Sequence, residues 1–272
     1  MPRRILKKSG SSDWGVGMVL AGVGIVLIAG LAYAAWYIRG TRVELDAQNC
    51  PTKGPRAIHM IVFDRSDPIT RQQAQRIEQV MQRYKGEALF GYRFDLYTFE
   101  GDTKNVLEPI LRICSPLRFE DANEIIQNPE RIKQAYDRDF SAVLDRTIRE
   151  LLVESTRDNS PIVESLKAAA ITSFGPVDKG RIPLRVTLVS DMVQHTALYS
   201  HFKSEADFSA LARNSAWATL RPDLKGASVD ILYLLRPTAK RGGAAIQSRG
   251  HQAFWEQLIA GGNGRLLSVE PL

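Results

Sequence analysis

Four oxygen-bearing side chains, at three places in the chain, have the types and setting that metal binding needs. Asp64 and Ser66 directly follow an apolar run over residues 57–63. Ser160 precedes a proline at the predicted start of a helix, and Asp191 follows a second apolar run. Carboxylate and hydroxyl oxygens are the ligands that hard divalent cations prefer. We therefore predict that these four side chains bind Mg²⁺, or alternatively Mn²⁺ or Ca²⁺, with water in the remaining positions.

Buried strands must position these residues. The run over residues 57–63 is too short for a helix and contains several β-branched residues, which predicts a central strand. An amphipathic helix is expected over residues 71–85. Asp64 and Ser66 then lie on the loop at the carboxyl end of a strand, where doubly wound α/β folds place their ligand sites.

Strands and helices alternate along most of the remaining chain. Further strands are predicted over residues 88–99, 105–114, 184–190, 227–235 and 265–269, and helices over residues 129–154, 204–220 and 247–260 and from Ser160 onward. The second and third strands follow each other without a helix, which suggests an antiparallel hairpin at a sheet edge. We therefore predict an α/β fold with a doubly wound, mainly parallel sheet and helices on both faces.

The same stretches resemble the von Willebrand factor A domain family and its metal-ion-dependent adhesion site. That family carries Asp-x-Ser-x-Ser after its first strand, a Thr that opens a later helix, and an Asp after its fourth strand. The corresponding stretches here are residues 64–68 (Asp-Arg-Ser-Asp-Pro), Ser160, and residues 188–191 (Leu-Val-Ser-Asp). The resemblance implies an A-type fold from about residue 57 to 269. It also implies a cation that completes its coordination with an acidic residue of a partner protein.

Two departures from the family pattern leave a second interpretation open. Pro68 stands where the family has its second Ser, and Ser160 replaces the Thr. The fold would then persist without the metal, as a degenerate scaffold or sensor domain. In that case Asp64 and Asp191 would only accept backbone hydrogen bonds or cap helices.

Two neighbours of these residues are candidates for supporting the metal ligands or contacting the partner. Asp67 adds a carboxylate that the family pattern does not contain, although Asp67-Pro68 is also a helix-start signal. His195 follows Asp191 closely enough to reach the same loop cluster, although a lone histidine is more often structural or solvated.

An apolar segment near the N-terminus predicts a membrane anchor. Residues 14–38 carry no charge, and at about 1.5 Å per residue they can cross a bilayer core of roughly 30 Å. Four Lys and Arg residues lie within residues 3–8, so the positive-inside rule predicts a cytoplasmic N-terminus. We expect a single-pass inner-membrane protein whose C-terminal domain is periplasmic or extracellular. A signal peptide cleaved near residues 32–34 (Ala-Tyr-Ala) is the alternative.

This anchor divides the chain into four predicted parts. They are a cytoplasmic N-terminus over residues 1–13, a transmembrane helix over 14–38, a linker over 39–55 and an A-like domain over 56–272. The two cysteines, Cys50 and Cys114, fit export, because in an oxidising compartment such a pair is more often a disulfide than a metal site or a nucleophile. Two free buried thiols are the alternative.

Composition and motifs narrow the classes of function. The formal charge of +6 over 272 residues is spread along the chain, and no aromatic residues interleave with basic ones, which argues against nucleic-acid binding. The chain contains no Gly-x-Ser-x-Gly elbow, Walker loop or His-Glu-x-x-His motif. We expect a non-enzymatic module that binds a protein partner in envelope adhesion or assembly. A haloacid-dehalogenase-like phosphatase with Asp64 as nucleophile is a further alternative.

Overall fold

The computed structural model describes residues 13–41, 43–99, 107–122, 127–153, 159–203 and 206–272. The chain divides into two compact units, residues 1–44 and 45–272. This boundary falls inside the linker predicted over residues 39–55. The basic cluster within residues 3–8, on which the predicted orientation depends, lies outside the described residues.

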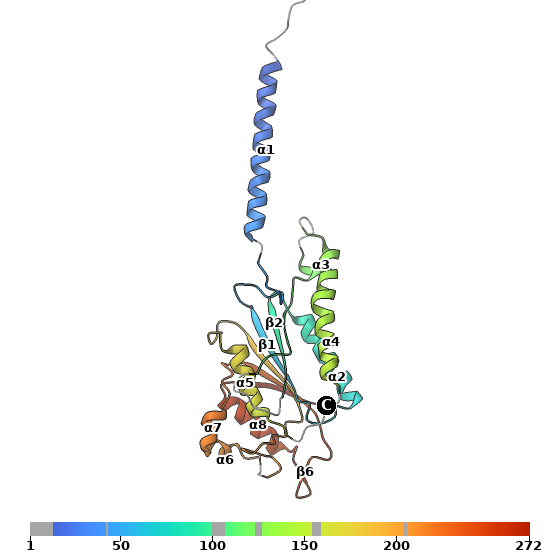
Figure 1. The fold of residues 1–272 in the computed structure, drawn as a ribbon, viewed down its shortest axis with the longest axis vertical. Coiled ribbons are helices and arrows are strands. Elements are labelled where there is room, and N and C mark those ends of the chain that lie inside the picture. The colour runs from blue at the N-terminus through green and yellow to red at the C-terminus, as the bar shows by residue number, and fades with distance from the viewer. Residues whose placement is uncertain (1–12, 42, 100–106, 123–126, 154–158, 204–205) are drawn as a thin grey trace, which may run out of the picture. The chain divides into compact units, whose positions relative to one another are not determined.

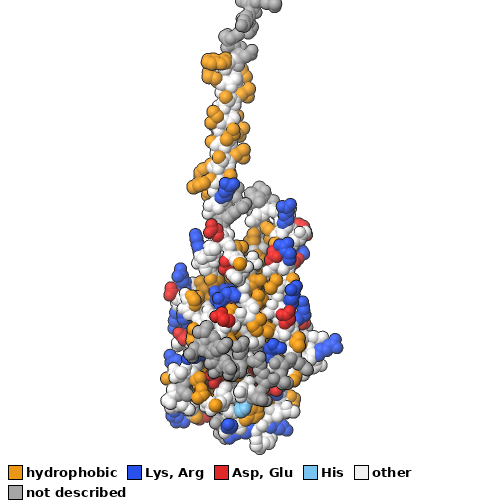
Figure 2. All heavy atoms as spheres, in the orientation of Figure 1, with side chains coloured by type: hydrophobic (Ala, Val, Ile, Leu, Met, Phe, Trp, Pro, Cys, Tyr) orange, Lys and Arg blue, Asp and Glu red, His pale blue; other side chains and the backbone are white. Residues whose placement is uncertain are grey.

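The first unit contains one long helix, α1 (Asp13–Thr41). Its segment Trp14–Tyr37 is long and apolar enough to cross a membrane, with a mean hydropathy of 2.4, and none of it is buried. Figure 2 shows apolar side chains along the visible length of this helix, whereas charged side chains of both signs are scattered over the second unit. This helix fits a single-pass membrane anchor, although a signal sequence has the same length and composition.

The second unit is built on a six-stranded sheet with the order β3-β2-β1-β4-β5-β8. Its strands are β1 (Ala57–Phe63), β2 (Tyr92–Thr98), β3 (Leu111–Cys114), β4 (Leu184–Ser190), β5 (Ser228–Tyr233) and β8 (Arg265–Pro271). Every neighbouring pair is parallel except β2 and β3, which are antiparallel at one edge. All seven residues of β1 are buried, as a central strand covered on both faces requires. The predicted α/β class and the antiparallel edge pair are confirmed.

Helices cover both faces of this sheet (Figure 1). One face packs on α2 (Arg71–Glu87) and α4 (Ala142–Leu151), and the other packs on α5 (Ile162–Phe174) and α8 (Arg249–Gly261). The shorter elements are a 3₁₀ turn (Phe119–Asp121), α3 (Pro129–Tyr136), a π turn (Asp137–Ser141), α6 (Phe208–Arg213), α7 (Ser215–Leu220) and a hairpin of β6 (Lys240–Arg241) with β7 (Ala244–Ala245). Two apolar cores therefore lie on opposite sides of the sheet, as a doubly wound fold requires.

Two of the predicted helices are interrupted in the structure. The helix predicted over residues 129–154 contains a π turn at Asp137–Ser141, which shifts the helix phase and accompanies the complete burial of Phe140. The helix predicted over residues 204–220 is two short helices separated at Asn214, whose backbone is extended. Residues 154, 204 and 205 of these predictions, and 105–106 of the third predicted strand, lie outside the described residues.

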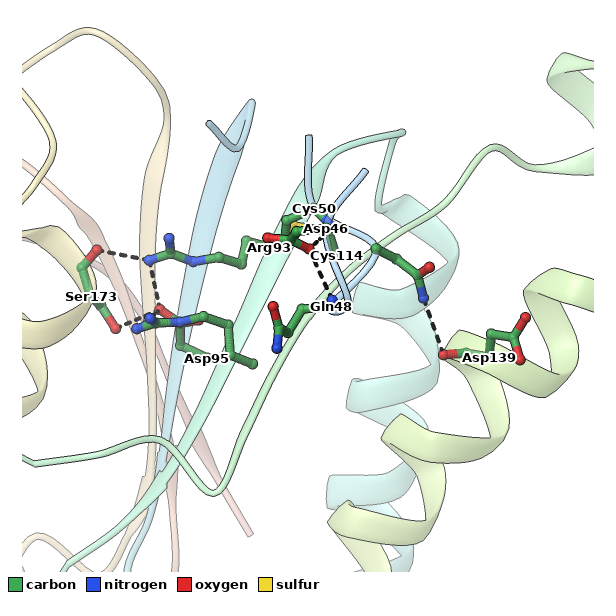
Figure 3. Close-up of a disulfide and its surroundings, with 10 residues drawn as sticks. Asp46, Gln48, Cys50, Arg93, Asp95, Cys114, Asp139 and Ser173 are labelled. Atoms are coloured by element: carbon green, nitrogen blue, oxygen red, sulfur yellow. Dashed lines mark hydrogen bonds and ion pairs between the residues drawn. A yellow bond between two sulfur atoms is a disulfide. The ribbon is translucent and has the colours of Figure 1, made fainter. Parts of the chain in front are cut away.

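A disulfide joins Cys50 to Cys114, as the sequence predicts. The turn before Cys50 is held by Asp46, whose Oδ1 accepts hydrogen bonds from the backbone N–H groups of Gln48 and Cys50 at 2.9 and 2.8 Å. The backbone N–H of Cys114 in turn donates to the carbonyl of Gln48 (Figure 3). The bridge closes a sequence separation of 64 residues, for which about 2–4 kcal/mol of stabilisation is typical. It fastens the segment just after the unit boundary to edge strand β3.

Candidate functional site

Asp64 lies at the centre of a hydrogen-bonded cluster at the carboxyl edge of the sheet. Its side chain is 3% exposed, and both of its oxygens are engaged. Oδ1 accepts from the backbone N–H of Ser66 at 2.9 Å. Oδ2 accepts from two hydroxyls, Ser160 Oγ at 3.2 Å and Ser190 Oγ at 2.7 Å. The structure therefore brings Asp64, Ser66 and Ser160 together, and it adds Ser190, which the sequence analysis did not select.

Ser160, which precedes the proline at the start of α5, is not the N-cap of that helix. The N-cap position of α5 is Pro161, and the helix begins at Ile162. Ser160 instead forms an isolated antiparallel bridge with His195, with N···O distances of 3.1 and 3.0 Å in the two directions. Because this pairing holds its backbone, the hydroxyl of Ser160 points to Asp64 rather than to the helix.

A side chain on the loop after β4 accepts a hydrogen bond from a backbone N–H in the first turn of α5. The side chain of Gln194 accepts from the backbone N–H of Val163 at 3.0 Å and donates to Glu164 at 2.7 Å. Thr196 adds a second hydrogen bond to Glu164, at 3.0 Å. A glutamine from another loop thus supplies the acceptor that Pro161 lacks, and it joins two of the three predicted site loops.

Asp191 is the second buried carboxylate of the cluster, and it is also 3% exposed. Its Oδ1 accepts from the backbone N–H of Val193 at 2.8 Å. Its Oδ2 lies 3.7 Å from Nε of Arg236, a residue on the loop after β5. Burial, followed by the nearby charge of Asp64, raises the pKa of Asp191 well above its ordinary value, and Arg236 opposes that rise.

Arg236 is the functional residue that the sequence analysis missed. Its guanidinium donates to the backbone carbonyls of Pro68 and, at 3.5 Å, Asp67, on the loop after β1. The signal was available, because β5 was predicted as a parallel strand, and the residues after such a strand lie at the same edge as Asp64 and Asp191. A pattern of metal ligands does not include an arginine, because the guanidinium is itself a cation.

Asp67 and His195, the predicted supporting residues, both lie beside the cluster. Asp67 is exposed, and its contact with the cluster is made by its backbone carbonyl. His195 pairs with Ser160 through its backbone, while its ring Nδ1 lies 2.8 Å from Ser200 Oγ. The ring also packs edge-on against Phe202. Asp67 is therefore exposed beside the cluster, and His195 is half-buried there.

The oxygen chemistry of this cluster suits a hard cation, but its charge arrangement does not fit one. The cluster offers two carboxylates and two hydroxyls, but both hydroxyls already donate to Asp64, and a guanidinium lies 3.7 Å from Asp191. Within the described ranges, no three His, Cys, Asp or Glu side chains are grouped so as to hold a metal ion. The divalent cation stays a prediction, which a titration decides.

Large apolar side chains and basic side chains are exposed on the loops after β4 and β5. Leu198 (55% exposed) and Phe202 (44%) lie on the loop after β4, and Leu235 (46%) lies on the loop after β5. Lys240 and Arg241, both exposed, form β6, which projects beyond the end of the sheet (Figure 1). The rim, as we call these five residues, combines apolar area with positive charge.

No protein-family model matches the chain, and no curated protein matches it. Among solved structures, the chain is similar to the crystal structure of an aerotolerance-related membrane protein from Bacteroides fragilis NCTC 9343 with multiple mutations to serines. The sequence identity is 16% and the TM-score is 0.37, and the match covers 79% of this chain and 92% of that chain. The assignment of the α/β fold rests on the sheet and helices described above.

Proposed function

We propose that this chain is a membrane-tethered, non-enzymatic binding module of the von Willebrand A type that engages an acidic segment of another protein. The rim carries this proposal. Exposed Leu, Phe, Lys and Arg side chains lie on loops that leave one edge of the sheet, around a hydrogen-bonded centre. Exposed apolar side chains beside charged ones are typical of protein interfaces, and the positive charge favours an acidic partner.

The arrangement of the cluster supports an A-type module over an enzyme. The strand order, with β1 and β4 central, places the loops after β1, β4 and β5 together, as the resemblance implies. The phosphatase alternative needs an accessible oxygen on Asp64 to attack a substrate. Both oxygens of Asp64 accept hydrogen bonds and the side chain is buried, which does not support a nucleophile.

The membrane setting is part of the same proposal. A single apolar helix followed by a disulfide-fastened segment suits a module held close to a bilayer in an oxidising compartment. We propose that the second unit is periplasmic or extracellular and that the module serves adhesion or assembly in the cell envelope. Mg²⁺ at Asp64 and Asp191 remains the prediction of the sequence, and the proposed function does not require it.

Position-specific crosslinking tests the function. A photoreactive residue placed at Leu198, Phe202 or Leu235 of the full-length chain in its membrane should give one common protein adduct. The same residue at Leu89, which is exposed before β2 at the opposite edge of the sheet, is the matched control. The reversal Arg241→Glu should weaken the adduct, and Lys53→Glu, also at the opposite edge, should not.

Two results would contradict the proposal. One is the same adduct from Leu89 as from Leu198, which would mean that the adduct reports abundance in the membrane rather than docking. The other is an adduct that Arg241→Glu strengthens, because an acidic partner must lose attraction when the rim becomes more negative.

A further inference from the structure

We infer that Arg236 is the built-in cation of the Asp64–Asp191 cluster, so that the proposed partner face is assembled without a divalent metal. The inference rests on the proposed function only in calling this edge a partner face. The side chain of Arg236 is 14% exposed, so its charge is held at the cluster rather than in solvent.

Arg236 connects three loops. Its Nε lies 3.7 Å from Asp191 Oδ2, on the loop after β4. Its two terminal nitrogens donate to the carbonyls of Asp67 and Pro68, on the loop after β1, while its own backbone belongs to the loop after β5. A planar guanidinium offers several donors in fixed directions, which a lysine ammonium does not. Arg236 thus links the three loops by two hydrogen bonds and one ion pair, and its Nε makes no hydrogen bond of its own.

The backbone of Arg236 is also anchored to the cluster. Its N–H donates to Gln247 Oε1 at 2.6 Å. The amide nitrogen of the same Gln247 donates to the carbonyls of Asp191 and Leu234, both at 2.9 Å. Because its backbone is linked through Gln247 to the segment that carries Asp191 and its guanidinium is hydrogen-bonded to the loop after β1, Arg236 is positioned before any ligand arrives.

Electrostatics makes the guanidinium and a divalent ion competitors. A cation bound between Asp64 and Asp191 would lie within a few ångströms of Arg236, and like charges at that range repel strongly in a buried site. The hydroxyls of Ser160 and Ser190 donate to Asp64 instead of being held ready for a metal.

A metal titration combined with a double-mutant cycle tests this inference on the full-length, detergent-solubilised protein. The variants are Arg236→Met, Asp191→Asn and the double variant, with Arg65→Met as the matched control. Arg65 lies on the loop after β1, and its guanidinium donates to the carbonyl of Val153. The readouts are Mn²⁺ binding by calorimetry and the unfolding temperature with and without EDTA.

We expect the wild type to show no saturable Mn²⁺ binding up to roughly 1 mM and no shift in unfolding temperature with EDTA. Arg236→Met should lower the unfolding temperature by roughly 4–8 °C, and much less when Asp191→Asn is already present. The effects of Arg65→Met and Asp191→Asn on the unfolding temperature should be additive. Saturable Mn²⁺ binding that Asp191→Asn abolishes would overturn the inference, as would additive effects of Arg236→Met and Asp191→Asn.

Repeating the crosslinking with EDTA, beside the double-mutant cycle, separates this inference from the proposed function. If EDTA removes the Leu198 adduct, the partner face needs a metal and the inference fails, while the binding function stands. If the Leu198 and Leu89 positions give identical adducts but Arg236 and Asp191 remain coupled, the function fails and the built-in cation stands.

Discussion

Two buried carboxylate clusters lie on the same sheet and differ in how their charge is compensated. Asp95, on β2, accepts from Arg93 at 2.8 Å, from Arg112 at 2.9 Å and from Ser173 at 2.7 Å (Figure 3). Two guanidiniums therefore face one carboxylate. At the carboxyl edge the ratio is reversed, with one guanidinium, that of Arg236, for the two carboxylates Asp64 and Asp191.

This difference separates a structural cluster from a candidate functional one. The Asp95 cluster joins β2 and β3 to α5, close to the disulfide, and its carboxylate is fully buried and hydrogen-bonded at both oxygens. The Asp64–Asp191 cluster joins loops, and it has one more carboxylate than guanidinium. Burying a negative charge without a cation beside it costs free energy. Sites with more buried charge than the fold needs are candidates for function, because stability alone does not favour such an arrangement.

The largest expected effect is at Asp95. Replacing Asp95 with Ala leaves Arg93 and Arg112 partly buried without their partner, and breaking a buried pair typically costs about 3–5 kcal/mol. Urea unfolding of the full-length chain, followed by tryptophan fluorescence, measures the loss. The rim crosslink from Leu198 should survive in the folded fraction. A loss below about 1 kcal/mol would show that this cluster is not the structural one.

A smaller effect is expected from the pH response of Asp191. Its pKa is raised in the folded protein by burial and by Asp64, so the native state keeps a proton that the unfolded chain has lost. The resulting stability is complete below the unfolded pKa of about 4 and is lost as the pH rises through the raised native pKa. Asp191→Asn should therefore gain stability relative to the wild type between pH 5 and pH 8.

Urea unfolding at these two pH values checks that sign. Asp178→Asn is the matched control, because Asp178 is exposed and pairs only at the surface with Arg181. The difference in the free energy of unfolding between Asp178→Asn and the wild type should be the same at both pH values. If Asp191→Asn instead became less stable relative to the wild type as the pH rose, Asp191 would be an ordinary ionised carboxylate. The contrast with Asp95 would then disappear.

The smallest effects distinguish two of the three serines that contact Asp64. The hydroxyl of Ser190 donates to Asp64 and accepts from the backbone N–H of Met192 at 2.7 Å, so Ser190→Ala should cost about 1–2 kcal/mol. Ser66 contacts Asp64 through its backbone, so Ser66→Ala should change the stability by no more than about 0.5 kcal/mol. The same urea titrations measure both. A larger loss in Ser66→Ala that appears only with added Mg²⁺ would restore Ser66 as a metal ligand.

Much of the fold follows from local patterns in the sequence. Six of the seven residues of β1 are apolar, which predicts a strand buried on both faces, and the alternation of strands with amphipathic helices predicts a parallel sheet. The two cysteines, taken with the predicted export of the chain, predict their bridge. The rule that loops at the carboxyl ends of parallel strands meet places Asp64, Ser66, Ser160 and Asp191 near one another. Periodicity does not reveal the π turn at Asp137–Ser141, because it depends on how Phe140 packs against the sheet.

The sequence by itself determined which residues gather at this edge, because strand direction and loop order are encoded locally. Only the tertiary structure decided what they do there. It turned the hydroxyls of Ser160 and Ser190 toward Asp64, and it brought Arg236 from a loop 45 residues after Asp191 to within 3.7 Å of that carboxylate. The physical reason is that charge compensation is a three-dimensional balance: which cation a buried carboxylate meets depends on packing between loops, and no spacing along the chain records it.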